Sequence, residues 1–271
     1  MNYREYARIL LEGPTLEDKL IPLKNVDYEI SNEQYALPES PGRIERLKFN
    51  NEQVKFPRNT SFHLEDKRGL ALHFFANHEL LAIEMMAAAL LIYPDTTNEM
   101  LQFKKGLIKT IQDEQKHLKL YMHRMNDFKM ELGDFPLNDF FWRSMDKMKT
   151  PSHFYSAMAL GFESANLDFA LFYEQSFKDV EDFETAKILR TVFEDEISHV
   201  ALGAHWLNAW KGESDLWSYF SSHLPGLMTP ARSKGIHFNR ESRVRAGLDD
   251  SFIDSLENYR DEFRVTNRKN W

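Results

Sequence analysis

Two short segments of this sequence combine residue types and a spacing that suit metal binding. Residues 113–117 read D-E-Q-K-H and residues 195–199 read D-E-I-S-H, so both follow the pattern D-E-x-x-H. In an α-helix, a Glu and a His three residues apart lie on one face, about 4.5 Å apart along the axis. A carboxylate oxygen and an imidazole nitrogen can then bind one cation or two adjacent ones. Roughly 0.04 such strings are expected by chance in this chain, so the repetition indicates a shared role.

Two further glutamates stand in strongly apolar surroundings. Glu84 is the only charge in LLAIEMMAAALLIY, and Glu163 lies within SAMALGFESANLDFALFY. Burying an uncompensated carboxylate costs several kcal/mol, and a metal ion would compensate it. The separations 114 − 84 = 30 and 196 − 163 = 33 each suit one antiparallel helical hairpin. The predicted ligands are Glu84, Glu114, His117, Glu163, Glu196 and His199.

Long helices are needed to position these residues, and the helix-starting and helix-ending residues of the chain predict where they lie. We expect helices over about 69–93, 98–132, 151–177 and 181–210, with a last helix near 249–264. Strand signals are scarce, so the predicted fold class is all-α. The first hairpin is uneven: about 10 residues separate Glu84 from Pro94, whereas 16 separate Asn98 from Glu114. This asymmetry predicts a bend or a longer turn.

The segments before and after these helices differ from them in composition. Residues 1–68 contain five prolines, which predicts an extended N-terminal arm or cap with a brief helix near 3–12. Residues 69–212 form the expected four-helix bundle, and 213–271 form a C-terminal helical extension. We expect the arm and the extension to cover the metal site.

The composition limits the classes of protein that the chain can belong to. It has 271 residues, a formal charge of −8 and no cysteine. The absence of cysteine excludes disulfides, thiolate zinc sites and cysteine-ligated iron–sulfur clusters. The acidic charge argues against a nucleic-acid partner. No apolar run of the roughly 18 residues needed for a membrane span and no secretory signal were recognised, so a cytoplasmic protein without membrane contact is expected.

The predicted ligand set also indicates which metal it would hold. Four carboxylates and two imidazoles form an oxygen-rich set that suits two Fe ions, or Mn or a mixed Mn/Fe pair, better than one tetrahedral zinc. Four glutamates at −4 balance two divalent ions at +4. Because the chain has no cysteine-ligated redox group of its own, an external electron donor is expected.

The pattern E…DExxH…E…DExxH resembles the ferritin-like superfamily of carboxylate-bridged dinuclear proteins, including bacterial multicomponent monooxygenases and ribonucleotide reductase small subunits. The resemblance implies a ferritin-like four-helix bundle with the six residues above as ligands. It also implies that Asp113 orients His199 and that Asp195 orients His117. Tyr121 stands four residues after His117, where ribonucleotide reductase small subunits place a radical tyrosine; the alternative is a core tyrosine.

A closer resemblance covers nearly the whole chain. It is to an uncharacterised bacterial family with a ferritin-like domain, and it is carried by LPESPGRIERLKF, HFFANHELLAIEMM, DEQKHLKLYMHRMNDFKMELGDFP, DEISHVALGAHW and HFNRESRVRAGL. The function we expect is an O₂- or peroxide-dependent oxidoreductase, a hydroxylase or oxidase, acting on an unidentified small organic substrate. A ferroxidase or other iron-handling protein and a tRNA-modifying hydroxylase are the alternatives. Homodimerisation is left open.

Overall fold

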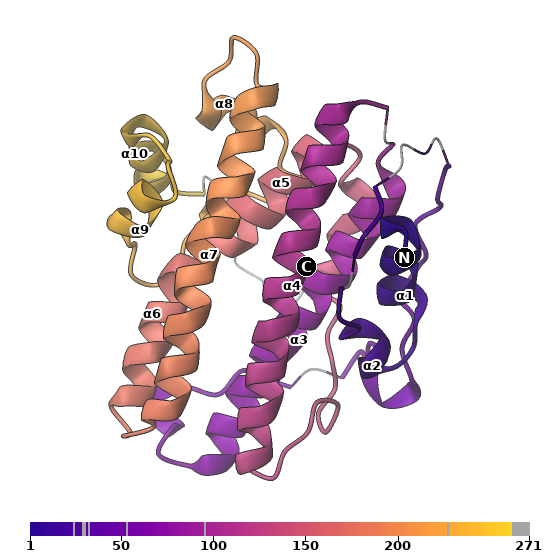
Figure 1. The fold of residues 1–271 in the computed structure, drawn as a ribbon. Helices are drawn as coiled ribbons and strands as arrows, with labels where there is room; N and C mark the ends of the chain where they lie inside the picture. Colours follow the sequence, from indigo (N-terminus) through magenta and orange to yellow (C-terminus); the bar gives the residue numbers. More distant parts are fainter. Residues whose placement is uncertain are drawn as a thin grey trace. The chain divides into compact units, whose positions relative to one another are not determined.

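The computed structural model describes residues 1–261 except 24, 29, 30, 32, 53, 95 and 227. Its regular structure, within those residues, is helical, apart from two isolated β-bridges that join Asn2 to Asp27 and Phe49 to Leu137 (Figure 1). The predicted all-α class is therefore confirmed.

Four stretches of long helix dominate the chain. They are α3 (Glu65–Ile92), α4 (Asn98–Asp127), the run of α5 (Pro151–Ala157), η4 (Met158–Glu163) and α6 (Ser164–Lys178), and α7 (Phe183–Trp210). The shorter helices are α1 (Tyr3–Glu12), α2 (Leu16–Lys19), α8 (Leu216–Ser222), α9 (Arg240–Arg245) and α10 (Asp250–Asn258), with 3₁₀ turns η1 (Glu45–Leu47), η2 (Asn59–Ser61), η3 (Trp142–Lys147) and η5 (Pro230–Ser233).

The helix ends differ from the predicted ones where local backbone conformation decides. α3 begins at Glu65, four residues before the predicted start, because its first turn is polar and gave no apolar signal. α4 stops at Asp127 because Phe128 leaves the helical region and Lys129 has a φ of 54°, a left-handed conformation that ends a helix. α10 ends at Asn258; the predicted helix reached 264, and residues 262–264 lie outside the described part.

The chain divides into two compact units. The first unit comprises residues 1–151 and 173–195, and the second comprises 152–172 and 196–271. In the first unit α3 and α4 pack along each other, and α1 packs on α3 (Figure 1). α3 is long and apolar enough to cross a membrane by length and composition, yet 83% of its most apolar window is buried inside the protein. Such burial is typical of a core helix.

In the second unit, the C-terminal segment is fastened to α6 by a buried ion pair. Arg243 of α9 donates to both carboxylate oxygens of Asp168, at 2.8 and 2.9 Å. The backbone N–H groups of Gly235 and Asn239 donate to the same carboxylate, at 2.8 and 2.7 Å. A buried carboxylate with this many donors is well compensated, so we call this arrangement the C-terminal clamp.

Candidate metal centre

In the first unit, three buried side chains can offer ligand atoms to one ion. Atoms of Glu79, Glu114 and His117 lie within 4.8 Å of one another. Their residues are 6%, 1% and 0% exposed. Glu79 comes from α3, and Glu114 and His117 come from α4. We call these three residues the first triad.

The orientation of His117 suits a metal ligand. Its Nε2 lies 2.8 Å from Oδ2 of Asp195, and its Nδ1 lies 3.1 Å from Oε2 of Glu114. A neutral imidazole carries one N–H. If that proton sits on Nε2 and is donated to Asp195, the lone pair of Nδ1 faces the Glu114 carboxylate. A cation between His117 Nδ1 and Glu114 Oε2 could then be bound by both atoms. The hydrogen bond from Nε2 to the Asp195 carboxylate is the one that a metal-bound histidine usually makes with its other nitrogen.

Asp195 is held ionised beside this histidine. Burial raises its pKa, but hydrogen bonds from His117 and Lys116 outweigh burial and lower the pKa of Asp195 to about 2. Lys116 also lies 3.5 Å from Oδ1 of Asp113. The prediction that Asp195 would lie against His117 thus corresponds to a contact in the structure. The proposed role of Asp113 toward His199 stays a prediction, because these residues belong to different units.

In the second unit, three side chains form a second group of the same composition. Atoms of Glu163, Glu196 and His199 lie within 4.8 Å of one another, and all three residues are buried. Nδ1 of His199 lies 3.3 Å from Oε2 of Glu196, as His117 lies against Glu114. Asn166 donates to Oε1 of Glu196 at 2.9 Å, so it orients that carboxylate. We call Glu163, Glu196 and His199 the second triad.

Glu163 is the last residue of a π-helical segment, η4, which interrupts the predicted third helix. Such segments are rare and are frequent at functional sites. Gly161, in the same segment, is closely packed, because a Cβ on it would lie 2.3 Å from Cε of Met228. A larger side chain at position 161 would therefore displace Met228.

Glu84 is not part of the first triad and lies in an ion-pair cluster of its own. Arg43 donates to Oε1 and Oε2 of Glu84 at 3.1 and 2.6 Å, and Nζ of Lys19 lies 3.1 Å from Oε1. All three side chains are almost fully buried. The compensation that a buried carboxylate needs thus comes from two cations of the N-terminal segment, which we call the N-terminal clamp. Glu79 stands where Glu84 was predicted.

Tyr121 is buried and contacts Phe75, with ring centroids 5.6 Å apart. Phe75 in turn contacts Tyr173. These contacts are typical of a core side chain. A redox role for Tyr121 stays a prediction.

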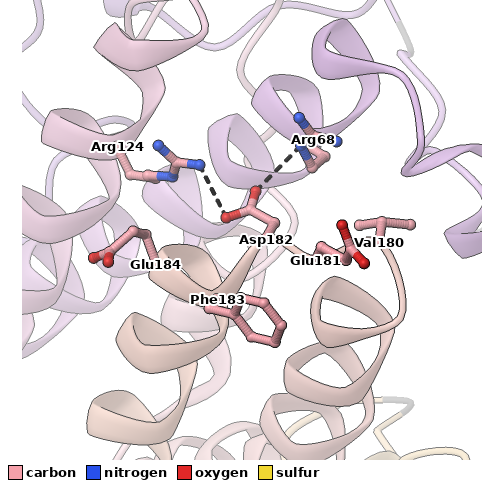
Figure 2. A pocket seen from close by; sticks show the side chains of 7 residues that line it. All are labelled: Arg68, Arg124, Val180, Glu181, Asp182, Phe183 and Glu184. Atoms are coloured by element: carbon pink, nitrogen blue, oxygen red, sulfur yellow. Dashed lines mark hydrogen bonds and ion pairs between the residues drawn. The ribbon is translucent and has the colours of Figure 1, made fainter.

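A surface pocket in the first unit lies at the turn between α6 and α7. Arg68, Arg124, Asp182 and their neighbours line it, and Figure 2 shows Asp182 between the two arginines. Its carboxylate oxygens lie 3.2 Å from Arg68 Nε and 2.9 Å from Arg124 Nη2. Both guanidinium groups are thus paired with Asp182 of the protein itself. These ion pairs connect the α6–α7 turn to α3 and α4, so we do not regard the pocket as a second candidate site.

The comparisons with known proteins identify a family but no reaction. Residues 13–254 match the family described as "Protein of unknown function (DUF455)", so the chain belongs to that family. An uncharacterized protein of Haemophilus influenzae is 26% identical over 203 residues, which cover 72% of this chain and 69% of that protein. The search of solved structures found no match. The predicted membership of an uncharacterised family is confirmed.

Proposed function

We propose that this member of the DUF455 family is a ferritin-like metalloprotein that binds two metal ions and uses them in an oxidation driven by O₂ or peroxide. One ion would be held by the first triad and the other by the second, which gives the two metal ions that the sequence resemblance implies. The observation that carries the proposal is the repeated triad: two carboxylates and one imidazole, buried, with Nδ1 of the histidine turned to a glutamate in each unit.

The residues of each triad fit a hard divalent ion. Each supplies carboxylate oxygens and one neutral imidazole nitrogen, the donor set of iron and manganese rather than of a thiolate metal. In each triad two carboxylates would balance one divalent charge. The same argument applied to Glu84 gives the opposite result, because Arg43 and Lys19 already balance it.

The chain's own residues would orient and shield the ions. Asp195 fixes the ring of His117 so that Nδ1 points to Glu114, and Asn166 holds Glu196. Because all six triad residues are buried, bulk water is kept from the ions, which strengthens local electrostatic interactions.

When bound, a pair of iron ions would supply the two electrons needed to reduce O₂ or peroxide. An external electron donor would restore them, and the substrate would be a small organic molecule. A cytoplasmic location is part of the same proposal.

Anaerobic titration with ferrous iron followed by exposure to O₂ tests the proposal. We expect about two irons bound and oxidised per chain and then no more, because a catalytic centre is stoichiometric. Glu114→Ala should abolish this oxidation, whereas the matched change Glu99→Ala, at an exposed position of the same helix, should not. Continued oxidation of hundreds of irons with formation of a mineral would favour the iron-storage alternative instead.

A further inference from the structure

Three aromatic side chains form a continuous stack in the second unit. Tyr155 of α5 stacks on Trp210 of α7, with ring centroids 6.2 Å apart and planes at 29°. Trp210 stacks on Trp206, at 5.2 Å and 28°. Tyr155 and Trp206 are buried, whereas Trp210, the last residue of α7, is partly exposed. The stack therefore joins the interior of this unit to its surface.

The inner end of the stack, Tyr155, approaches α7 one turn after His199 of the second triad. Gly203 permits this approach: a Cβ there would lie 2.2 Å from Cβ of Ala159 and 3.6 Å from Cδ1 of Tyr155. Any larger residue would push α7 away from η4 and Tyr155.

The same helix carries the ligand and the stack. His199, Gly203 and Trp206 are spaced by four and three residues on α7, which puts them on one helical face. All three belong to the segment DEISHVALGAHW, of which the triad explains only the first half.

We propose that Trp210, Trp206 and Tyr155 form a path for single electrons between the surface of the second unit and the ion held by the second triad. The inference rests on the proposed function. In each transfer Trp210 would give up one electron, which crosses the ring of Tyr155 toward the second triad. Peroxide is the final oxidant, and each peroxide takes up two such electrons and two protons to form two water molecules. The indole then releases its Nε1 proton to water. A one-electron reductant such as ascorbate returns the electron, and water returns the proton.

Each member of the stack has a separate part in this path. Trp206 stacks on Trp210 on the side away from Tyr155 and passes an electron to the oxidised ring of Trp210, so the oxidation is shared between the two indoles. Tyr155 acts as a bridge that keeps its proton, so an aromatic ring at position 155 should suffice without the hydroxyl. A phenylalanine at position 155 should therefore support electron transfer, and a leucine should not.

The test maps oxidation within the full chain. Protein loaded anaerobically with ferrous iron is mixed with two equivalents of hydrogen peroxide per pair of irons, exposed to air, and digested for peptide mass spectrometry. The first equivalent oxidises both ferrous ions, and the second takes its two electrons from the tryptophans. Without a reductant, the indole radical of Trp210 combines with O₂ and is recovered as oxygenated tryptophan. We expect this product at Trp210 and Trp206, and only the level of iron-free protein at Trp142 and Trp217. Ascorbate should suppress it.

The variants separate a path from simple proximity, and iron binding is measured for each of them. Tyr155→Phe should retain the products at Trp210, and Tyr155→Leu should lose them. Trp210→Phe, at a partly exposed position that tolerates change better, should lose the product at Trp206. Wild-type levels at Trp210 in Tyr155→Leu, or at Trp206 in Trp210→Phe, would show attack by a diffusing oxidant and overturn the path.

The two proposals fail in distinguishable ways. If wild-type protein binds two irons and consumes peroxide while Trp210 stays unmodified, the electron path is wrong and the proposed function stands. If it binds no iron, both are wrong.

Discussion

Glu79 and Glu84 stand five residues apart on α3, and replacing each by glutamine should give opposite phenotypes. Glu79 belongs to the first triad, and Glu84 belongs to the N-terminal clamp. If Glu79 is a ligand, as we propose, Glu79→Gln should lower the metal affinity by more than the roughly 10–100-fold that loss of an outer-sphere partner costs. The stability of the metal-free protein should change little or rise, because one carboxylate of a clustered set is gone.

Glu84→Gln should act on folding instead. It leaves the buried cations Arg43 and Lys19 without the carboxylate that now accepts from them at 2.6–3.1 Å. Removing one partner of a buried ion pair costs about 3–5 kcal/mol, and the remaining amide oxygen puts the expected loss near the lower end, about 3 kcal/mol. For a chain of this size that corresponds to a fall in Tm of about 6–12 °C.

Two measurements on each variant decide the matter. Denaturant unfolding of chelator-treated protein gives the free energy of unfolding, and titration with Co²⁺ gives the metal affinity. Glu65→Gln, at an exposed site in the first turn of the same helix, is the matched control and should change neither. Metal binding at wild-type affinity in Glu79→Gln, or lost metal binding with unchanged stability in Glu84→Gln, would refute our assignment of the two residues.

Three further predictions concern the triads and one buried histidine. Asp195→Asn should weaken metal binding about 10–100-fold without abolishing it, as Co²⁺ titration would show; an unchanged affinity would contradict the role assigned to Asp195. Iron at 100 times its Kd should stabilise the fold by about 2.7 kcal/mol over chelated protein, and a Tm that chelation leaves unmoved would indicate that the triads bind no metal. His73 is buried, which lowers its pKa to about 4; its neutral Nε2 accepts from the N–H of Gly133 at 3.1 Å. Its contribution to stability is complete above the unfolded pKa of about 6.5 and is lost as pH falls toward 4, so the free energy of unfolding should drop by about 2 kcal/mol more between pH 7.5 and 5 in wild type than in His73→Gln. Equal drops in the two proteins would show that folding does not lower the pKa of His73.

The sequence predicted the helical elements and the two D-E-x-x-H segments because these depend on local spacing. It named Glu84, whereas the structure groups Glu79, five residues earlier on the same helix, with Glu114 and His117. The uneven hairpin was the signal that could have decided between them. Glu79 lies 15 residues before Pro94, and Glu114 lies 16 after Asn98, so Glu79 makes the hairpin even. Apolar surroundings pointed to Glu84 instead, because a distant cation such as Arg43 cannot be read from local sequence.

The π segment before Glu163 was also beyond sequence reasoning. An α-helix and a π-helix differ by one residue in the spacing of their backbone hydrogen bonds, and the string MALGFE carries no proline or polar cap that would mark the change. The determinant is tertiary: Ala159 contacts Gly203 on α7, and Gly161 receives Met228 from a distant loop. Both contacts depend on residues more than forty positions away.

The two clamps give an independent reason to pair Glu79 with Glu163. Glu84 follows Glu79 by five residues, and Asp168 follows Glu163 by five. Each of these following carboxylates is buried and accepts two hydrogen bonds from one arginine.

Those arginines, Arg43 and Arg243, come from opposite ends of the chain, within LPESPGRIERLKF and HFNRESRVRAGL. These are two of the segments that carried the family resemblance and that the triads left unexplained. In each unit, then, a flanking segment is tied to the helix just beyond the glutamate that belongs to its triad. Because a ligand carboxylate must be held within a fraction of an ångström, fixing that helix by a buried ion pair is a physical reason for the arm and the extension to be part of the protein.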